Sequence, residues 1–208
     1  MKKFGFLMFL LAIVAMLGAA AQAQGVSYVD NSVFFTTYYS ANQAGAPDAT
    51  LRIINDGDAP TTLYADIFVF DDSEELTQCC SCLVTPDGLL SESVKLNLTA
   101  NPLRSIVNTR GVIKVISNTF PFIAPTFAPE VPFPGLRVWM THIQGTKVTL
   151  SPGLPIVPVV AGPYFVTETL AADSNLGAGE QTLIESLCKY DFLLSGKPCT
   201  CQPEDYDF

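Results

Sequence analysis

Six cysteines are the residues of this chain whose spacing is best suited to chemistry. Three form a tight CC-x-C cluster, and the other three follow more than 100 residues later: Cys79, Cys80 and Cys82, then Cys188, Cys199 and Cys201. Sequence alone does not choose among the many pairings that six cysteines allow. Adjacent cysteines make poor partners, so the economical arrangement joins the first cluster to the second by disulfides.

Zinc is the rival interpretation of the cysteines, and a free or redox-active thiol is a third. The usual paired C-x2-C spacing of a structural zinc site is absent, and the single histidine, His142, is far away in sequence. His142 lies in a strand-like segment, where a structural role is favoured over general-base catalysis. Acidic runs at 56–58 and 71–75 could bind calcium loosely, but neither matches an EF-hand loop. With no nucleophile elbow, HExxH motif or phosphate loop, we expect no enzyme, metal or cofactor.

The first 24 residues predict export. A positive start at 1–3 precedes an apolar run at 4–18 and an A-x-A cleavage site at 21–23, so residues 1–23 are interpreted as a signal peptide. No cysteine precedes Cys79, which argues against lipid attachment at the new N-terminus. We therefore expect a secreted protein, extracellular or at the cell surface, with no membrane anchor after cleavage and in a compartment where disulfides persist.

Composition narrows the classes of partner. The 208 residues carry a net charge of −9, and removal of Lys2 and Lys3 with the signal leaves 9 basic against 20 acidic residues. An acidic chain without a basic patch is not expected to bind nucleic acid or anionic membranes. Because 49% of residues are hydrophobic and 15% charged, the chain fits a β-rich domain or one that hides surface in an assembly.

Short β-type runs bounded by turn residues recur along the chain and predict an all-β protein, an antiparallel, immunoglobulin-like β-sandwich with one short C-terminal helix. The helix is expected at 182–192, where apolar residues share one face. We divide the mature chain into an N-terminal strand at 24–40, a sandwich at 41–178, and a helix with a disulfide-tethered tail at 179–208. The expected strands are 33–39, 50–54, 62–70, 94–98, 112–116, 136–143, 147–150, 156–160 and 164–170.

The N-terminal strand is apolar on both faces, so it should be buried on both. It is either the first strand of the chain's own sandwich or a donor strand that completes the sheet of a neighbouring subunit. The second interpretation predicts a homo-oligomer or homopolymer. Its subunit-interface residues are Val33, Phe34, Phe35, Tyr38 and Tyr39.

A proline- and phenylalanine-rich segment at 120–135 predicts a long loop, since proline cannot donate to a sheet ladder. The loop either packs its phenylalanines down as a lid over the sandwich or exposes them to recognise a partner. The second interpretation predicts an extracellular glycan or protein ligand. The ligand-binding residues are then Phe127, Phe133 and Trp139.

Two resemblances bear on function. The order of parts, signal, short lead, β-rich N-terminal segment and sandwich, resembles donor-strand-exchanged pilin-type subunits. The motifs at 79–82 (CCSC), 85–89, 98–103 (LTANPL) and 141–144, with the late cysteines, resemble uncharacterised secreted bacterial β-sandwich proteins. The resemblances imply export and carry over no catalytic residue. We expect a structural or adhesive self-assembling subunit, with a monomeric binding module as the alternative and an enzyme using His142 least favoured.

Overall fold

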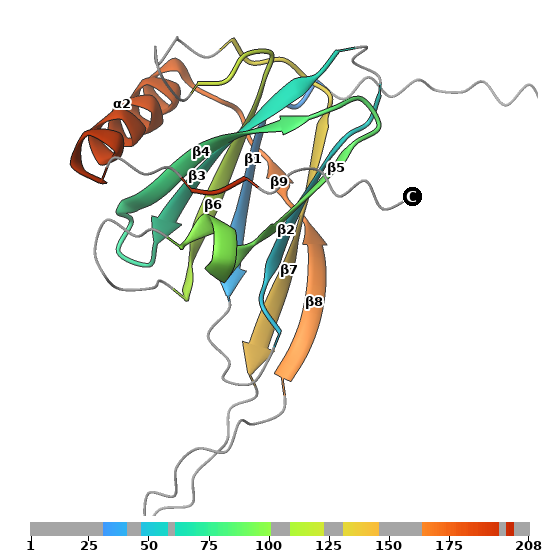
Figure 1. Cartoon of the computed structure of the whole chain (residues 1–208), viewed down its shortest axis with the longest axis vertical. Coiled ribbons are helices and arrows are strands. Elements are labelled where there is room, and N and C mark those ends of the chain that lie inside the picture. The colour runs from blue at the N-terminus through green and yellow to red at the C-terminus, as the bar shows by residue number, and fades with distance from the viewer. Residues whose placement is uncertain are drawn as a thin grey trace, which may run out of the picture.

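The computed structural model describes residues 31–40, 47–57, 61–100, 109–122, 131–145, 164–195 and 199–201. Within these ranges the chain forms antiparallel strands in two packed sheets with one α-helix near the C-terminal end, which confirms the predicted all-β sandwich (Figure 1). The signal peptide, the expected strands at 147–150 and 156–160, and Phe127 lie outside the described residues.

Two sheets make up the sandwich. Sheet A contains β1 (Phe34–Ser40), β3 (Leu63–Asp71), β4 (Leu76–Val84), β6 (Arg110–Asn118) and β9 (Ala172–Asp173), in the order β4-β3-β6-β1-β9. Sheet B contains β2 (Thr50–Asn55), β5 (Leu89–Ser93), β7 (Leu136–Gly145) and β8 (Tyr164–Leu170), in the order β5-β2-β7-β8. The helices are the π-helix η1 (Val94–Leu98) and α2 (Ala178–Ser195).

Strand β3 shows why sheet A is buried on both faces. Its residues alternate as the sequence predicts: Leu63, Ala65, Ile67 and Val69 join the core between the two sheets, whereas Phe68 and Phe70 join a second apolar cluster on the outer face. That cluster also contains Ile184 of α2. The molecule therefore has three layers, with α2 covering the outer face of sheet A (Figure 1).

The expected strand at 94–98 is wrong, because this segment is the π-helix η1. Polar side chains within and beside η1 form hydrogen bonds with the local backbone. These backbone groups are then not available for pairing in a sheet. The Ser93 hydroxyl accepts from the Leu96 amide at 3.1 Å, the Asn97 side-chain oxygen accepts from the Ser93 amide at 2.9 Å, and the Thr99 amide donates to the Val94 carbonyl at 2.7 Å.

The chain crosses from sheet B to sheet A between β8 and β9. Ala171 lies at the crossing, is buried, and donates its amide to the Val138 carbonyl at 2.8 Å. On the other side of the crossing, Ser174 donates to the Phe34 carbonyl at 2.9 Å. The two-residue strand β9 follows β8 directly and pairs with β1 of sheet A. It therefore does not extend sheet B beyond β8.

Candidate functional site

The six cysteines form three disulfides that join the first cluster to the second, as predicted. The pairs are Cys79–Cys188, Cys80–Cys199 and Cys82–Cys201, with Cα atoms 5.8, 5.2 and 5.4 Å apart. The sulfur atoms of Cys80, Cys82 and Cys201 lie within 4.8 Å of one another, but each belongs to a disulfide and presents no thiolate to a metal ion.

Two of the disulfides hold residues 199–201 against the edge of sheet A, and the third ties α2 to β4. Cys199 donates its amide to the Cys79 carbonyl of β4, and Thr200 donates to the Asn97 carbonyl of η1, both at 3.2 Å. Residues 199–201, the described part of the C-terminal tail, therefore lie between the β4 edge of sheet A and η1, which follows β5 of sheet B. Part of the β4 edge, around Cys79, is therefore covered by a covalently fixed segment.

Most of the predicted interface residues of the N-terminal strand are used within this chain. All seven residues of β1 pair with β6, and Phe35 and Thr36 also pair with β9 on the other edge. Phe35 and Tyr39 are buried in the core between the sheets, Phe34 is buried under α2, and Val33 packs against the same outer cluster. Tyr38 is the exception, with 45% of its surface exposed.

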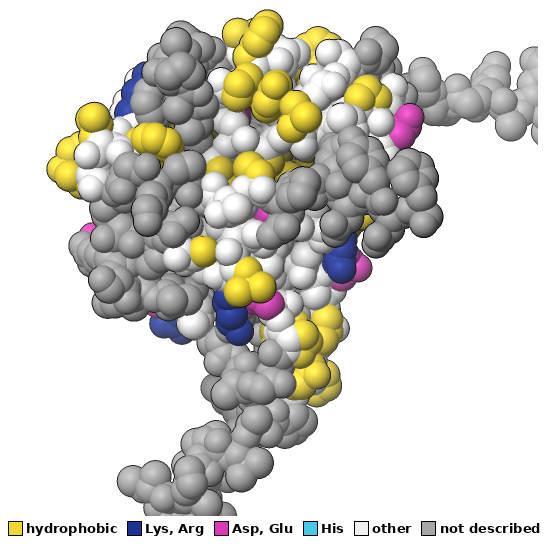
Figure 2. Space-filling view, in the orientation of Figure 1, with side chains coloured by type: hydrophobic (Ala, Val, Ile, Leu, Met, Phe, Trp, Pro, Cys, Tyr) yellow, Lys and Arg dark blue, Asp and Glu magenta, His cyan; other side chains and the backbone are white. Residues whose placement is uncertain are grey.

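The opposite side of the sandwich has an open edge at β8. Among the described residues this strand pairs only with β7, on one side, and all seven of its residues are exposed. Phe165 and Leu170 are each 62% exposed, and hydrophobic side chains are visible on this part of the surface (Figure 2). Its single charged residue, Glu168, lies 2.9 Å from the Arg52 guanidinium of β2. An edge of this length, apolar and almost uncharged, is a template for another strand.

His142 links its own strand, β7, to β8 and to β1 of sheet A. Its ring is buried, stacks on Tyr38 with the centroids 3.9 Å apart, and places Nε2 2.6 Å from the Thr169 hydroxyl of β8. Burial lowers the pKa of His142, which favours the neutral ring. The arrangement fits the structural role that the sequence favoured.

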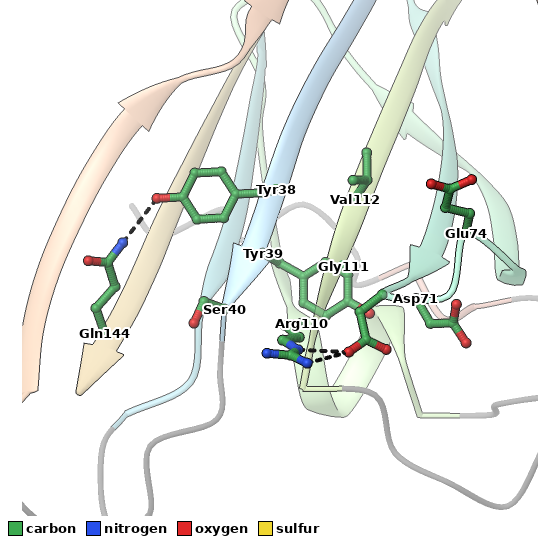
Figure 3. A pocket seen from close by; sticks show the side chains of 10 residues that line it. Tyr38, Tyr39, Ser40, Asp71, Glu74, Arg110, Gly111, Val112 and Gln144 are labelled. Atoms are coloured by element: carbon green, nitrogen blue, oxygen red, sulfur yellow. Dashed lines mark hydrogen bonds and ion pairs between the residues drawn. The ribbon is translucent and has the colours of Figure 1, made fainter. Parts of the chain in front are cut away.

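A hollow of about 670 Å³ opens beside Tyr38, where β1 ends and β6 begins (Figure 3). Arg110 pairs with Asp72 at 2.7 Å, and Gln144 donates to the Tyr38 hydroxyl at 3.1 Å. The Asp71 carboxylate accepts from the backbone of the 71–75 turn, so this acidic run is a capped turn. The buried Tyr39 hydroxyl has no hydrogen-bond partner among the described residues, and burial together with Asp71 and Asp72 raises the pKa of Tyr39.

The predicted aromatic ligand site is divided between the two sheets. Phe133 is 39% exposed and its amide donates to Ser117 at the end of β6, whereas Trp139 is partly buried in β7 of sheet B opposite Arg52. Phe122 packs down onto Phe68, with ring centroids 6.2 Å apart. In the described part of the loop, Phe122 behaves as a lid and Phe133 as an exposed residue.

Comparison with known proteins adds little to these observations. No known protein family and no curated protein match the sequence. The chain is similar to a solved structure described as that of Thermotoga maritima 1070, at 14% identity and a TM-score of 0.39, over 69% of this chain and 94% of the other. Within the described ranges, α2 is not apolar enough to span a bilayer.

Sequence reasoning missed the position of β8 at a sheet edge and the hollow beside Tyr38. Tyr164–Leu170 was expected as a strand, but its place at a sheet edge depends on pairings between distant segments. The hollow was missed because its residues come from β1, the β3–β4 turn, β6 and β7. The low charge of 164–170 was the only available signal for the edge.

Proposed function

We propose that this chain is a secreted structural subunit that associates with copies of itself by adding a strand to β8. The three disulfides are compatible with an extracellular protein, and they support the export signal read from the sequence. The proposal keeps the self-assembly expected from composition and assigns it to a different strand.

One observation carries the proposal: among the described residues, all seven positions of β8 are exposed and no strand pairs with its outer edge, while part of the β4 edge of sheet A is covered by the disulfide-held residues 199–201. Natural sheets protect exposed edges with charges, prolines, bulges or covering segments. Strand β8 contains no proline, and its one charge is paired with Arg52. A free edge without protection supports strand addition, in which main-chain hydrogen bonds give affinity and side chains give specificity.

Donation of β1 to a neighbour is the less favoured mechanism. Its side chains lie in both apolar clusters, so its removal would expose Phe34, Phe35 and Tyr39 and break its pairing with β6. Each large buried apolar side chain contributes about 1.5–3 kcal/mol. Association through β8 leaves these contacts intact.

Sedimentation velocity over a concentration series, with the chain from Gln24 onward, tests the proposal. We expect reversible self-association that Phe165→Lys/Val166→Lys abolishes, since one lysine then projects from each face of β8. Leu89→Lys is the matched control, because Leu89 is an exposed apolar residue on the other edge of sheet B. A wild-type protein that stays monomeric up to millimolar concentration contradicts the proposal.

A monomeric extracellular binding module is the second candidate. The observation that favours it is the exposure of Phe120, Val131 and Phe133 at the two described ends of the 120–135 loop, at 66%, 60% and 39%. An exposed apolar patch on a monomer is often a binding site. This candidate predicts a monomer that binds members of a glycan array and loses that binding in Phe133→Ala, with Leu89→Ala as control.

A further inference from the structure

We propose that the strand added to β8 is the β8 strand of a second copy, antiparallel and related by a two-fold axis at Thr167. The inference rests on the proposed function, because it names the partner and the register of that association. In this register Thr167 faces its own equivalent. The other facing pairs are Val166 with Glu168, Phe165 with Thr169, and Tyr164 with Leu170.

Charge and length select this register. A two-fold axis at Thr167 brings all seven residues of both strands into register, whereas any shifted axis leaves end residues unpaired. An axis one residue further along, at Glu168, would place two carboxylates directly opposite each other, which is destabilising. With the axis at Thr167, each Glu168 faces an uncharged valine and keeps its own partner, Arg52, at 2.9 Å.

The side chains of the two faces are also compatible with self-pairing. Thr167 lies opposite His142 and Thr169 opposite the buried Met140, so the odd-numbered residues point toward the side of sheet A. There Phe165 would pack beside Thr169 of the second copy. Tyr164 and Leu170 would meet on the other face, and aromatic–aliphatic cross-strand pairs contribute roughly 0.2–1 kcal/mol each. Since all seven residues are already exposed, no side chain must leave the core.

The symmetry fixes the shape of the complex. A two-fold axis between antiparallel strands of one sheet is perpendicular to that sheet, so the two copies of sheet B become one sheet of order β5-β2-β7-β8-β8-β7-β2-β5. Both copies of sheet A then lie on the same side of it. The contact is isologous and closes on itself, which gives a dimer. A longer assembly would need a second contact elsewhere on the surface.

Cysteine cross-linking reads the register directly. Facing residues of antiparallel strands have Cα atoms about 4.5–5.5 Å apart, within reach of a disulfide. Thr167→Cys should therefore form a covalent dimer under mild oxidation. Val166→Cys and Glu168→Cys are the matched controls: each is displaced by two residues from its own equivalent, about 7 Å along the strand. Neither should cross-link alone, but an equimolar mixture of the two should.

Non-reducing gels measure the covalent dimer, and peptide mapping checks that the three native disulfides are unchanged. Sedimentation of the wild type is measured in parallel. Covalent dimers from Thr167→Cys and from the 166/168 mixture support the inference. A wild-type dimer in which Thr167→Cys does not cross-link, or cross-links no faster than the two single controls, overturns the register and leaves the proposed function standing. A monomeric wild type overturns both.

Discussion

Asp66 should make this protein less stable as the pH rises from acid to neutral. The carboxyl is completely buried between sheet A and α2, where Asn118 donates to it at 3.1 Å and the Phe122 amide at 3.3 Å, together with the Ser81 hydroxyl. Burial is the main cause that raises the pKa of Asp66 to about 7, and the three hydrogen bonds oppose it without cancelling it. The nearby Glu185 carboxylate adds to the increase.

The sign and size follow from proton linkage. Between its ordinary value of 3.8 and about 7, the folded protein retains a proton on Asp66 that the unfolded chain has released. The stabilisation is complete below pH 3.8, decreases through this interval, and is lost above pH 7. At about 1.4 kcal/mol per unit of pKa difference, the total change is about 4 kcal/mol. The raised pKa of Asp191, about 6 through burial, acts in the same direction.

The variant Asp66→Asn isolates this effect. An amide cannot titrate, but its NH2 group would face one of two donors, the Asn118 side chain or the Phe122 amide, which adds a penalty of about 1–3 kcal/mol that does not depend on pH. We expect the difference in unfolding free energy between variant and wild type to shift by about 4 kcal/mol in favour of the variant from pH 4 to pH 8.

Urea unfolding with the disulfides intact, at five pH values across this range, measures the difference, and other titrating groups cancel in it. Parallel stability curves for Asp66→Asn and wild type would refute the reasoning, because they would mean that Asp66 titrates alike in both states.

Two further predictions concern backbone packing and the disulfides. Gly111→Ala should destabilise by about 3 kcal/mol in thermal unfolding, since its Cβ would lie 1.9 Å from the Phe70 carbonyl, whereas Gly179→Ala, with open space around it in α2, should be neutral or slightly stabilising. Equal effects would contradict this. Cys82→Ser/Cys201→Ser should lower the unfolding free energy by only about 2 kcal/mol despite a separation of 119 residues, because the adjacent bond already closes the large loop. A loss of 4 kcal/mol or more in denaturant would show that this bond acts independently.

The strands that could be predicted are those with a regular apolar pattern between turn residues. Strand β3 follows its period-2 pattern closely, and β8 was expected with the bounds that the structure has. Strand β4 was missed because the CC-x-C cluster within it was considered for its cysteine chemistry and not as part of a strand. At 94–98, the apolar residues predicted a strand, but side chains of Ser93, Asn97 and Thr99 bond the backbone locally.

The candidate site was harder to predict than the strands, because it is formed by pairing between segments that are far apart in the sequence. The joining of the two cysteine clusters could be predicted because adjacent and i,i+2 cysteines make poor partners for each other. The position of β8 at an edge could not, since it follows from β7 pairing with β2 on its other side. The buried carboxyl of Asp66 was equally hidden, because its alternation with Phe68 and Phe70 predicts only a face, and α2 is what buries that face.

The charge of the chain and the composition of β8 act in opposite directions on self-association. A net charge of −9 makes two copies repel at long range, while β8 offers a contact made of backbone groups and uncharged side chains. Salt screens the repulsion and leaves main-chain hydrogen bonds and apolar burial almost unchanged. An association through β8 should therefore tighten as ionic strength rises, whereas an association held by ion pairs would weaken. The acidic surface would then limit non-specific contacts between copies without opposing the pairing that we propose for β8.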